Sequence, residues 1–463
     1  MKKDWEIKKQ NLEGRTPSTC EAGVSPLQTS SLPQHALKAG WEIKKLGEVT
    51  QICLGLTHTP KYQETGIPFI SVKDISSGNL SFDNTKRISK EEYDSMPWGA
   101  KPKKEDVLFC RVGTIGIPQI VKTDDDFGIF VSVGFFRTYD TLFNEYLKYW
   151  LYSDNFFYQV EKNVVGSTIK NLNTGWLKNF TLPVPPLEEQ KRIVKILDEK
   201  FAQLESLKAN AQTNLQNAKD LFQSQLSQAF EQKDCHTDSG LLTQSQKKDF
   251  KDFPLGKSNP CGNKWKTVRL GDCGTFKNGM NFAATDSGYT IRSLGVGDFK
   301  DRYSIDDTET LSEISLKAAP SEDYLLHDGD IVFVRSNGNK ELVGRCLLVY
   351  PKDIPTTYSG FCIRFRKDFD LLDADFLLHF MKAESSRKIL NGKEGANISN
   401  LNQKILGDFE VPLPPLPEQK RIVKELDALS EKVKALCTIY EKQIADCDEL
   451  KQSYLCKAFE GEL

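Results

Sequence analysis

Two arginines end matching apolar runs of this chain. Arg111 closes the run "DVLFCR", Arg335 closes "DIVFVR", and a glycine-containing stretch follows each run. A guanidinium group in such a place can form two hydrogen bonds with a guanine edge or with a phosphate group. An internal ion pair with the carboxylate of the same run, Asp106 or Asp330, is an equally good interpretation. These residues therefore indicate either recognition of nucleic acid or a structural ion pair.

Further polar side chains lie at the ends of predicted strands. The candidates for contact with bases or with the DNA backbone are Lys73, Asp74, Lys300, Arg302, Arg137 and Arg364. The candidates for phosphate contact, in the loop before the last strand of each half, are Thr168, Lys170, Asn171, Asn397, Ser399 and Asn400. A solvated loop or a role in forming a turn is the alternative for these residues.

The motifs of common catalytic sites do not occur. The sequence contains no G-x-x-x-x-G-K-[ST] loop, no G-x-S-x-G, no H-E-x-x-H, no dinucleotide-binding fingerprint and no Asn-Pro-Pro-aromatic tetrapeptide. The eleven cysteines form no C-x-x-C pair, so we expect reduced structural thiols in a cytoplasmic protein and no metal site. The sequence thus predicts a binding protein without catalytic residues.

Length and charge limit the alternatives further. A chain of 463 residues should form two to four domains, and its net charge of −2 argues against a uniformly basic nucleic-acid coat. No run of apolar residues is long enough for a transmembrane helix. The lysines near the N-terminus precede no apolar segment, so they do not indicate a secretory signal.

The chain is an internal repeat. "WEIKKLG" at Trp41 matches "WKTVRLG" at Trp265, and "DVLFCR" matches "DIVFVR", both at an offset of 224 residues. "GSTIKNLN" at Gly166 and "PPLEEQKRIVKILD" at Pro185 have their matches at an offset of 229. Twelve of the fourteen residues of the latter segment are identical in both copies. Matches in constant order predict two homologous halves.

Each half should fold as a mixed α/β domain followed by a long helix. Short apolar runs punctuated by Gly, Asp and Asn indicate strands, and the prolines of "PPLEEQ" favour a helix start. Apolar residues then recur at heptad spacing, which predicts a helix of roughly 40–45 residues and a coiled coil. The expected seam residues are Val194, Leu197, Leu204, Val423, Leu426 and Val433. We expect the two helices to cover each other in antiparallel order about a pseudo-two-fold axis; packing of each helix on its own domain is the alternative.

Six polar residues at the start of the helices are identical in both copies, although a solvated face needs no such identity. We predict that they dock two identical partner subunits, while recent duplication alone is the alternative. These residues are Gln190, Lys191, Arg192, Gln419, Lys420 and Arg421.

The repeat defines the expected domain boundaries. We predict a poorly ordered N-terminal extension over 1–38, which holds a second "WEIKK" at Trp5. The remaining segments are a first recognition domain at 39–182, a first helix at 183–235, a polar linker at 236–264, a second recognition domain at 265–411 and a second helix at 412–463.

The doubled motifs resemble those of a known family. The patterns "WxxxxLG[ED]", "D-[VI]-[LV]-x-x-R", "G-x-x-I-x-N-L" and "PPLxEQKRIV", each present twice, are similar to those of the specificity subunit of type I restriction-modification systems. The resemblance implies an α/β (α+β) fold with two target-recognition domains. Each of these would read half of a bipartite, asymmetric DNA sequence, and the two conserved helices would separate them.

The resemblance also implies partners. Two modification subunits would bind S-adenosylmethionine and methylate adenine at N6, and restriction subunits would cleave DNA with ATP and Mg²⁺. This chain itself would hold no cofactor and carry no catalysis. The alternatives are a self-contained DNA methyltransferase or endonuclease, and a coiled-coil scaffold that does not bind DNA.

Overall fold

The computed structural model describes residues 38–75, 78, 80–112, 115–163, 172–230, 265–283, 285–299, 302–390 and 400–463. These residues belong to two compact units. The first unit combines the chain up to Ala209 with Ile444–Leu463, and the second is Asn210–Gln443. Apart from Lys38, the predicted N-terminal extension lies outside the described residues, as does the predicted linker.

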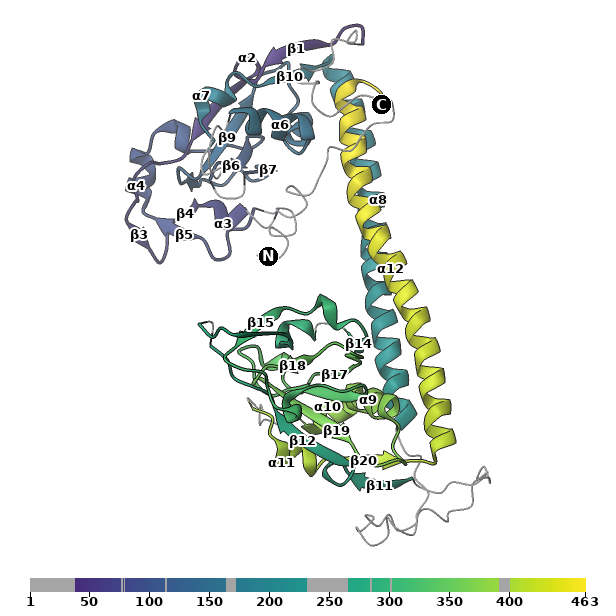
Figure 1. The fold of residues 1–463 in the computed structure, drawn as a ribbon. Coiled ribbons are helices and arrows are strands. Elements are labelled where there is room, and N and C mark those ends of the chain that lie inside the picture. Colours follow the sequence, from purple (N-terminus) through teal and green to yellow (C-terminus); the bar gives the residue numbers. More distant parts are fainter. Residues whose placement is uncertain are drawn as a thin grey trace. The chain divides into compact units, whose positions relative to one another are not determined.

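The first domain contains three sheets (Figure 1). They have the strand orders β2-β9-β6-β7, β3-β5-β4-β8 and β1-β10, and the last pair joins the start of the domain to its end. The strands are β1 (Glu42–Lys45), β2 (Thr50–Leu54), β3 (Tyr62–Gln63), β4 (Ile67–Ile70), β5 (Lys86–Ile88), β6 (Val107–Cys110), β7 (Gly116–Ile120), β8 (Gly128–Ile129), β9 (Val133–Thr138) and β10 (Thr181–Val184). The helices are α2 (Leu46–Val49), α3 (Val72–Ile75), α4 (Lys90–Ser95), η1 (Trp98–Ala100), α5 (Asn144–Trp150), α6 (Asp154–Asn163) and α7 (Thr174–Leu177).

The second domain repeats this plan with the strand orders β12-β19-β16-β17-β14, β15-β13-β18 and β11-β20. The strands are β11 (Lys266–Arg269), β12 (Gly274–Asn278), β13 (Tyr289–Leu294), β14 (Ser304–Ile305), β15 (Glu313–Leu316), β16 (Asp330–Val334), β17 (Cys346–Val349), β18 (Thr356–Tyr358), β19 (Cys362–Lys367) and β20 (Glu410–Leu413). The helices are η3 (Leu270–Asp272), η4 (Val296–Asp298), η5 (Thr308–Thr310), η6 (Glu322–Tyr324), η7 (Lys340–Leu342), α9 (Ala374–Lys382), α10 (Glu384–Leu390) and α11 (Gln403–Gly407).

A long helix follows each domain, as predicted. Helix α8 (Leu187–Phe230) has 44 residues and α12 (Leu416–Glu460) has 45. Acidic residues in the first turn of each helix favour its start, because they interact with unpaired backbone N–H groups there. No glycine, and no proline beyond the first turn, interrupts either helix.

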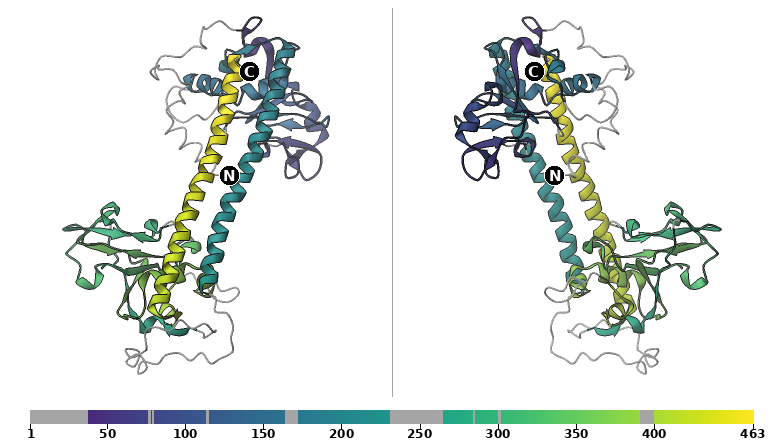
Figure 2. Two further views of the ribbon diagram at one scale, coloured as in Figure 1. Left: turned by 90° about the vertical axis from the view of Figure 1, so that its right-hand side faces the viewer. Right: turned by 90° about the vertical axis from the view of Figure 1, so that its left-hand side faces the viewer.

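The hydrophobic core of the first unit joins one domain to parts of both helices. Val194 and Leu197 of α8 share a buried cluster with the domain and with Leu455, Ala458 and Phe459 near the end of α12. The ring of Phe459 packs edge-on against Tyr146 of α5, with 5.2 Å between ring centroids. The beginning of α8 therefore lies beside the end of α12 in this unit, and the two run in opposite directions (Figure 2).

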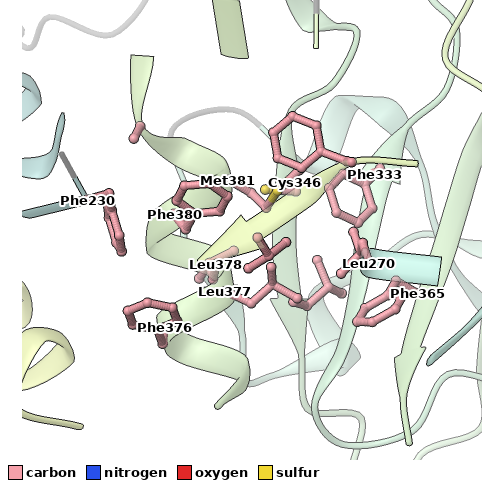
Figure 3. Packing of buried hydrophobic residues seen from close by; sticks show 14 of the residues in the cluster. Phe230, Leu270, Phe333, Cys346, Phe365, Phe376, Leu377, Leu378, Phe380 and Met381 are labelled. Carbon is pink, nitrogen blue, oxygen red and sulfur yellow. The ribbon is translucent and has the colours of Figure 1, made fainter. Parts of the chain in front are cut away.

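The second unit is built in the same way. Figure 3 shows Phe230, at the end of α8, beside Phe376 and Phe380 of α9, and the ring centroids are 5.3 and 5.2 Å apart. Leu426 and Val433 of α12 belong to the same buried cluster. Both interpretations of helix packing are therefore correct in part, because each helix packs on its own domain and also beside the other helix.

The predicted seam is confirmed in both copies. Five of its residues are buried and the sixth, Val423, is half-buried against the second core. Lys208 interrupts the apolar spacing of α8, and its Nζ atom lies 2.6 Å from an Asp448 carboxylate oxygen of α12. A second ion pair, between Glu205 and Lys451, lies one turn away along the helices. Ion pairs therefore join the helices where Lys208 interrupts the buried apolar positions Leu204 and Ala211.

A buried glutamine fixes each helix to its domain. The Gln190 side chain accepts a hydrogen bond from the Phe143 backbone N–H at 2.8 Å and donates to the carbonyl oxygens of Thr141 and Pro185 at 2.9 and 2.8 Å. Gln419 makes the equivalent three hydrogen bonds, to Asp373, Leu371 and Pro414. Both side chains are completely buried. The prediction that these two glutamines dock a partner is wrong, because all their polar atoms bind backbone inside the unit.

The other four predicted docking residues remain exposed. Arg192 pairs with Glu189 and Arg421 pairs with Glu418, each through two hydrogen bonds of 2.7–2.8 Å. Lys191 pairs with Glu188 at 2.8 Å, and Lys420 is exposed beside these residues. Partner docking through this face remains a prediction.

A second polar contact between domain and helix differs in the two copies. In the first unit the Tyr149 hydroxyl donates to Asp198 of α8. In the second unit His379 takes the place of the tyrosine, and its Nε2 atom lies 2.8 Å from Asp427 of α12. Desolvation lowers the pKa of the buried His379, although the hydrogen bond to Asp427 opposes this effect. The second unit therefore has a buried imidazole at this junction, where the first unit has a phenol.

The lowered pKa of His379 predicts a pH-dependent stability. The unfolded chain binds a proton near pH 6.5 and the folded unit resists it, so the stabilisation is present above about pH 6.5 and is lost as the pH falls. We expect the free energy of unfolding of the second unit to fall by up to about 1.4 kcal/mol per pH unit in this range. His379→Tyr, which copies the first unit, should remove that dependence. Urea unfolding at pH 7.5 and 5.5 measures the free energy of unfolding at both pH values. If the variant lost as much stability between them as the wild-type protein, the prediction would be contradicted.

Candidate nucleic-acid interface

One end of the first domain gathers five chain segments. The N–H of Val131 donates to the carbonyl of Leu56, and the N–H of Phe130 to that of Ile70, both at 2.9 Å. The N–H of Arg111 donates to Ser132 at 2.9 Å, and its carbonyl accepts from Leu172 at 3.0 Å. We call residues 55–61, 71–75, 111–112, 130–132 and 172 the loop end of the first domain. It brings together predicted binding residues that lie far apart in the sequence.

The second domain repeats these contacts. Ser359 N–H donates to Leu294 at 2.9 Å, and Gly360 N–H donates to Met280 at 2.7 Å. Arg335 N–H donates to Phe361, and the Arg335 carbonyl accepts from Leu401, both at 2.8 Å. We call residues 279–283, 295–299, 335–339, 359–361 and 400–401 the loop end of the second domain.

A glycine makes the close approach of these loops possible in each domain. An added Cβ atom on Gly55 would lie 2.3 Å from the Phe130 carbonyl oxygen, and one on Gly279 would lie 2.1 Å from that of Ser359. Every other residue would clash with the backbone there. These glycines are not among the predicted site residues, although their repeat offset of 224 residues is a signal that could have identified them.

Arg111 and Arg335 follow matching strands at the loop ends, but their guanidinium groups differ in their hydrogen bonds. The Arg111 guanidinium donates through Nε to the Leu172 carbonyl at 2.7 Å and through Nη1 to Val131 at 3.4 Å, so it ties loops together. The guanidinium of Arg335 is half-buried and hydrogen-bonds to no residue that the structure describes. The interpretation that either arginine pairs with the carboxylate of its own run is wrong.

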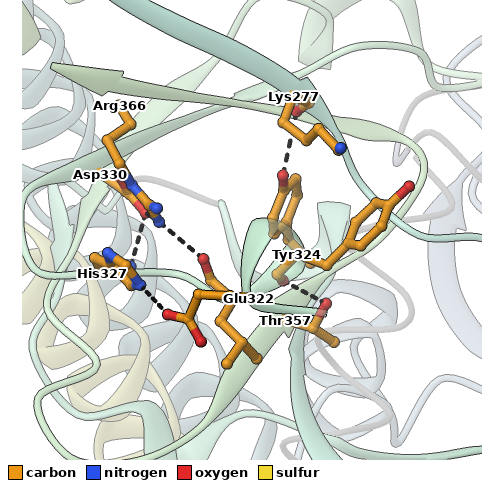
Figure 4. Close-up of polar contacts among 9 residues, drawn as sticks. Lys277, Glu322, Tyr324, His327, Asp330, Thr357 and Arg366 are labelled. Carbon is orange, nitrogen blue, oxygen red and sulfur yellow. Dashed lines mark hydrogen bonds and ion pairs between the residues drawn. The ribbon is translucent and has the colours of Figure 1, made fainter. Parts of the chain in front are cut away.

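Those carboxylates pair with other arginines. Arg137 Nε and Nη2 donate to Asp106 at 2.9 and 2.6 Å, and Arg366 makes the same fork with Asp330 at 2.9 and 2.7 Å. Figure 4 shows the second fork, with the backbone N–H of His327 also reaching Asp330. Asp106 and Asp330 are almost wholly buried, and the hydrogen bonds raise the pKa of both guanidinium groups.

Two predicted binding arginines are therefore unsuited to that role. Arg137 is held in an internal ion pair at the opposite end of its strand from the loop end. Arg364 is 5% exposed, so its side chain does not reach a ligand in this conformation. At the offset of 229 residues Arg366 matches Arg137, and Arg364 matches the buried Phe135. Arg366, and not Arg364, is therefore the counterpart of Arg137 in the second domain.

The remaining candidates are partly at the loop ends. Lys73 and Arg302 are exposed, whereas Asp74 caps its own turn by accepting from the N–H and the hydroxyl of Ser71, both at 2.7 Å. Asn400 is exposed and forms a bridge with Ser336. The candidates outside the described residues are Thr168, Lys170, Asn171, Lys300, Asn397 and Ser399.

Neither thiols nor acidic clusters provide a second kind of site in the described parts of the chain. No three His, Cys, Asp or Glu side chains there are placed to hold a metal ion. Burial raises the pKa of the Cys53 thiol to about 11 and that of Cys346 to about 11, so both remain protonated at neutral pH. In the same residues, no helix is long and apolar enough to cross a membrane.

Comparison with known proteins gives consistent matches in both halves of the chain. The family model described as type I restriction modification DNA specificity domain matches residues 38–217 and again residues 262–442. The chain is 26% identical to the type I restriction enzyme StySPI specificity subunit of Salmonella potsdam, over 92% of this chain and 90% of that protein. It is 25% identical to the EcoKI specificity subunit of Escherichia coli strain K12, with the same coverage.

Solved structures support the fold. A chain from a study of complex assembly and conformational transition of the type I R-M system has a TM-score of 0.69 at 20% identity, covering 92% of this chain and 99% of that one. The HsdS subunit from Thermoanaerobacter tengcongensis has a TM-score of 0.54 at 21% identity, covering 92% and 98%.

Two arginine substitutions in the second domain should separate structure from binding. Arg366→Ala leaves the buried Asp330 without its partner and should lower the free energy of unfolding by about 3 kcal/mol. Arg335→Ala should change it by less than about 0.5 kcal/mol but lower affinity for DNA roughly tenfold. Urea unfolding and a DNA titration at one fixed salt concentration measure both effects. Equal loss of stability in the two variants would refute the assignment.

Proposed function

Because this chain belongs to the family of type I restriction-modification DNA specificity domains, we propose that it directs its complex to one split, asymmetric DNA sequence. The family model covers both halves of the chain, so DNA sequence specificity is the role of both. In this proposal each domain reads one half-site. The observation that carries it is the loop end, which occurs once in each domain with the same backbone contacts and different exposed side chains.

Specificity by two related domains has a physical basis. Contacts with phosphate groups position a protein on DNA, and contacts with base edges distinguish sequences. The loop end of the first domain offers the exposed Lys73 for the first purpose, and Arg302 is an exposed cation three residues beyond a segment of the second loop end. Because the exposed side chains of the two loop ends differ, the two half-sites should differ in sequence as well.

We further propose that the chemistry resides in partner subunits. The sequence contains none of the common catalytic motifs named above, so methylation of adenine at N6 and ATP-dependent cleavage would belong to modification and restriction subunits. Those subunits would also bind S-adenosylmethionine, ATP and Mg²⁺. A cytoplasmic location agrees with this role, because the described cysteines are free thiols.

The two long helices suggest where two identical modification subunits dock. Between residues 199–222 of α8 and the matching 428–451 of α12, only two positions are identical: Leu207 with Leu436, and Leu221 with Leu450. All four leucines are exposed, by 58%, 41%, 53% and 47% respectively. Buried seam positions in the same stretch differ, as in Leu204 and Val433.

This contrast favours an external contact. A buried seam tolerates exchange of one apolar residue for another of suitable volume, so it does not require identity. An exposed leucine has no such packing requirement within the chain. Its retention at matching positions of both helices supports a surface that meets the same partner twice, as in a pair of identical subunits.

Co-expression with the cognate modification subunit tests the proposed function. The complex should methylate adenines in one split sequence, whereas this chain alone should methylate none. Methylome sequencing of cells with and without this chain measures both. Methyl transfer by the purified chain would favour the self-contained enzyme, and absence of a split motif would favour the scaffold that does not bind DNA.

The exposed leucines give a separate prediction for assembly. Leu207→Lys with Leu436→Lys should abolish binding of both modification subunits, because a charged group would replace the apolar contact while helix propensity is kept. Either substitution alone should remove one subunit. Light scattering after gel filtration measures the stoichiometry. The exposed residues immediately before them provide the control, Ser206→Lys with Ala435→Lys, and equal losses in both double variants would contradict docking at the leucines.

A further inference from the structure

The turn between β8 and β9 in the first domain has the same backbone hydrogen bonds as the turn between β18 and β19 in the second domain, but it carries a different side chain. A hydrogen bond from Val133 N–H to the Phe130 carbonyl closes the first turn, and one from Cys362 to Ser359 closes the second, both at 2.8 Å. Ser132 and Phe361 take the same position in these turns. Their carbonyl oxygens accept from the N–H groups of Arg111 and Arg335. The backbone of the turn is thus the same in both domains, whereas the side chain at this position is different.

The loop after the first strand of the sheet lies beside this turn in both domains. Bridges join Leu56 to Phe130 and Met280 to Ser359. Two residues beyond each bridge position, this loop carries the exposed His58 in the first domain and Phe282 in the second. The close approach at Gly55 and Gly279 holds the loop against the turn.

Each domain therefore presents two tip residues of one chemical character. The first domain presents His58 and Ser132, which donate and accept hydrogen bonds. The second presents Phe282, which is 39% exposed, and Phe361, which is 59% exposed, and their rings have neither donor nor acceptor. Two phenylalanines exposed on loops that contact each other through their backbones, at the same end of a domain, suit binding more than folding.

We infer that these tip pairs determine the sequence of the two half-sites, and that Phe282 and Phe361 contact bases through apolar surface. The inference rests on the proposed function and deepens it. Arg335 is directly beside Phe361 in the fold, and its guanidinium has no hydrogen-bond partner in the described parts of the chain. A cation next to an apolar tip matches DNA, which offers phosphate groups beside base surfaces.

A phenyl ring can contact a DNA base in two ways that need no hydrogen bond. A phenyl ring can pack on the C5-methyl group of thymine in the major groove, or it can enter between two bases and unstack them. Replacing thymine by uracil in the half-site removes the methyl group and weakens only the first kind of contact. Unstacking instead raises the fluorescence of 2-aminopurine placed at the contacted step.

The experiment uses the complex with its modification subunits and the duplex that the wild-type complex methylates. Phe361→Ser and Phe282→His transfer the tip residues of the first domain into the second. Each should lower the methylation rate on that duplex roughly tenfold. Methylome sequencing should show altered bases in one half of the split motif, with the other half unchanged.

Tyr289→Ser is the matched control, because Tyr289 is an exposed aromatic residue at the start of β13, whose other end meets the loop end. It should change the rate less than twofold. The inference is overturned if both tip variants, shown to be folded by unchanged unfolding curves, keep the wild-type rate and motif. A wild-type complex without any split motif would instead overturn the proposed function, and with it this inference.

Discussion

A fully buried glutamine at the start of each long helix fixes that helix to the domain that precedes it. Gln190 and Gln419 each bind two backbone groups of their domain and one at the helix entrance. Leaving such buried groups unpaired would cost about 1–3 kcal/mol each, so no apolar residue can replace the glutamine. The orientation of each domain on its own helix, and hence the placing of its loop end, depends on this contact.

Comparison of the two halves distinguishes the residues that hold the backbone from the residues exposed on the loops. Residues that hold the backbone, such as Asp106 and Asp330 or Gly55 and Gly279, keep their identity and their contacts in both domains. Residues at the tips of the loops change character, from His58 and Ser132 to Phe282 and Phe361. A frame that fixes loop position while tip residues vary allows one fold to read different sequences.

The same comparison changes the interpretation of the helices. Identity near their start results from internal hydrogen bonds and from ion pairs such as Glu189 with Arg192. Between residues 199–222 and 428–451, identity is confined to exposed leucines, whereas the identical Leu226 and Leu455 nearer the helix ends are buried. Burial therefore distinguishes residues retained for the fold from those that suit a partner.

Local patterns in the amino-acid sequence are enough to predict the doubled plan, the mixed α/β class, the length of both helices and their apolar seam. These features depend on local periodicity and on turn residues, which act within a few positions of each other. Three features depend instead on long-range contacts. These are the arginine partners of Asp106 and Asp330, the burial of Gln190 and Gln419, and the assembly of each loop end from five distant segments. Long side chains reach partners on strands that long-range register brings together, and a linear pattern does not contain that register.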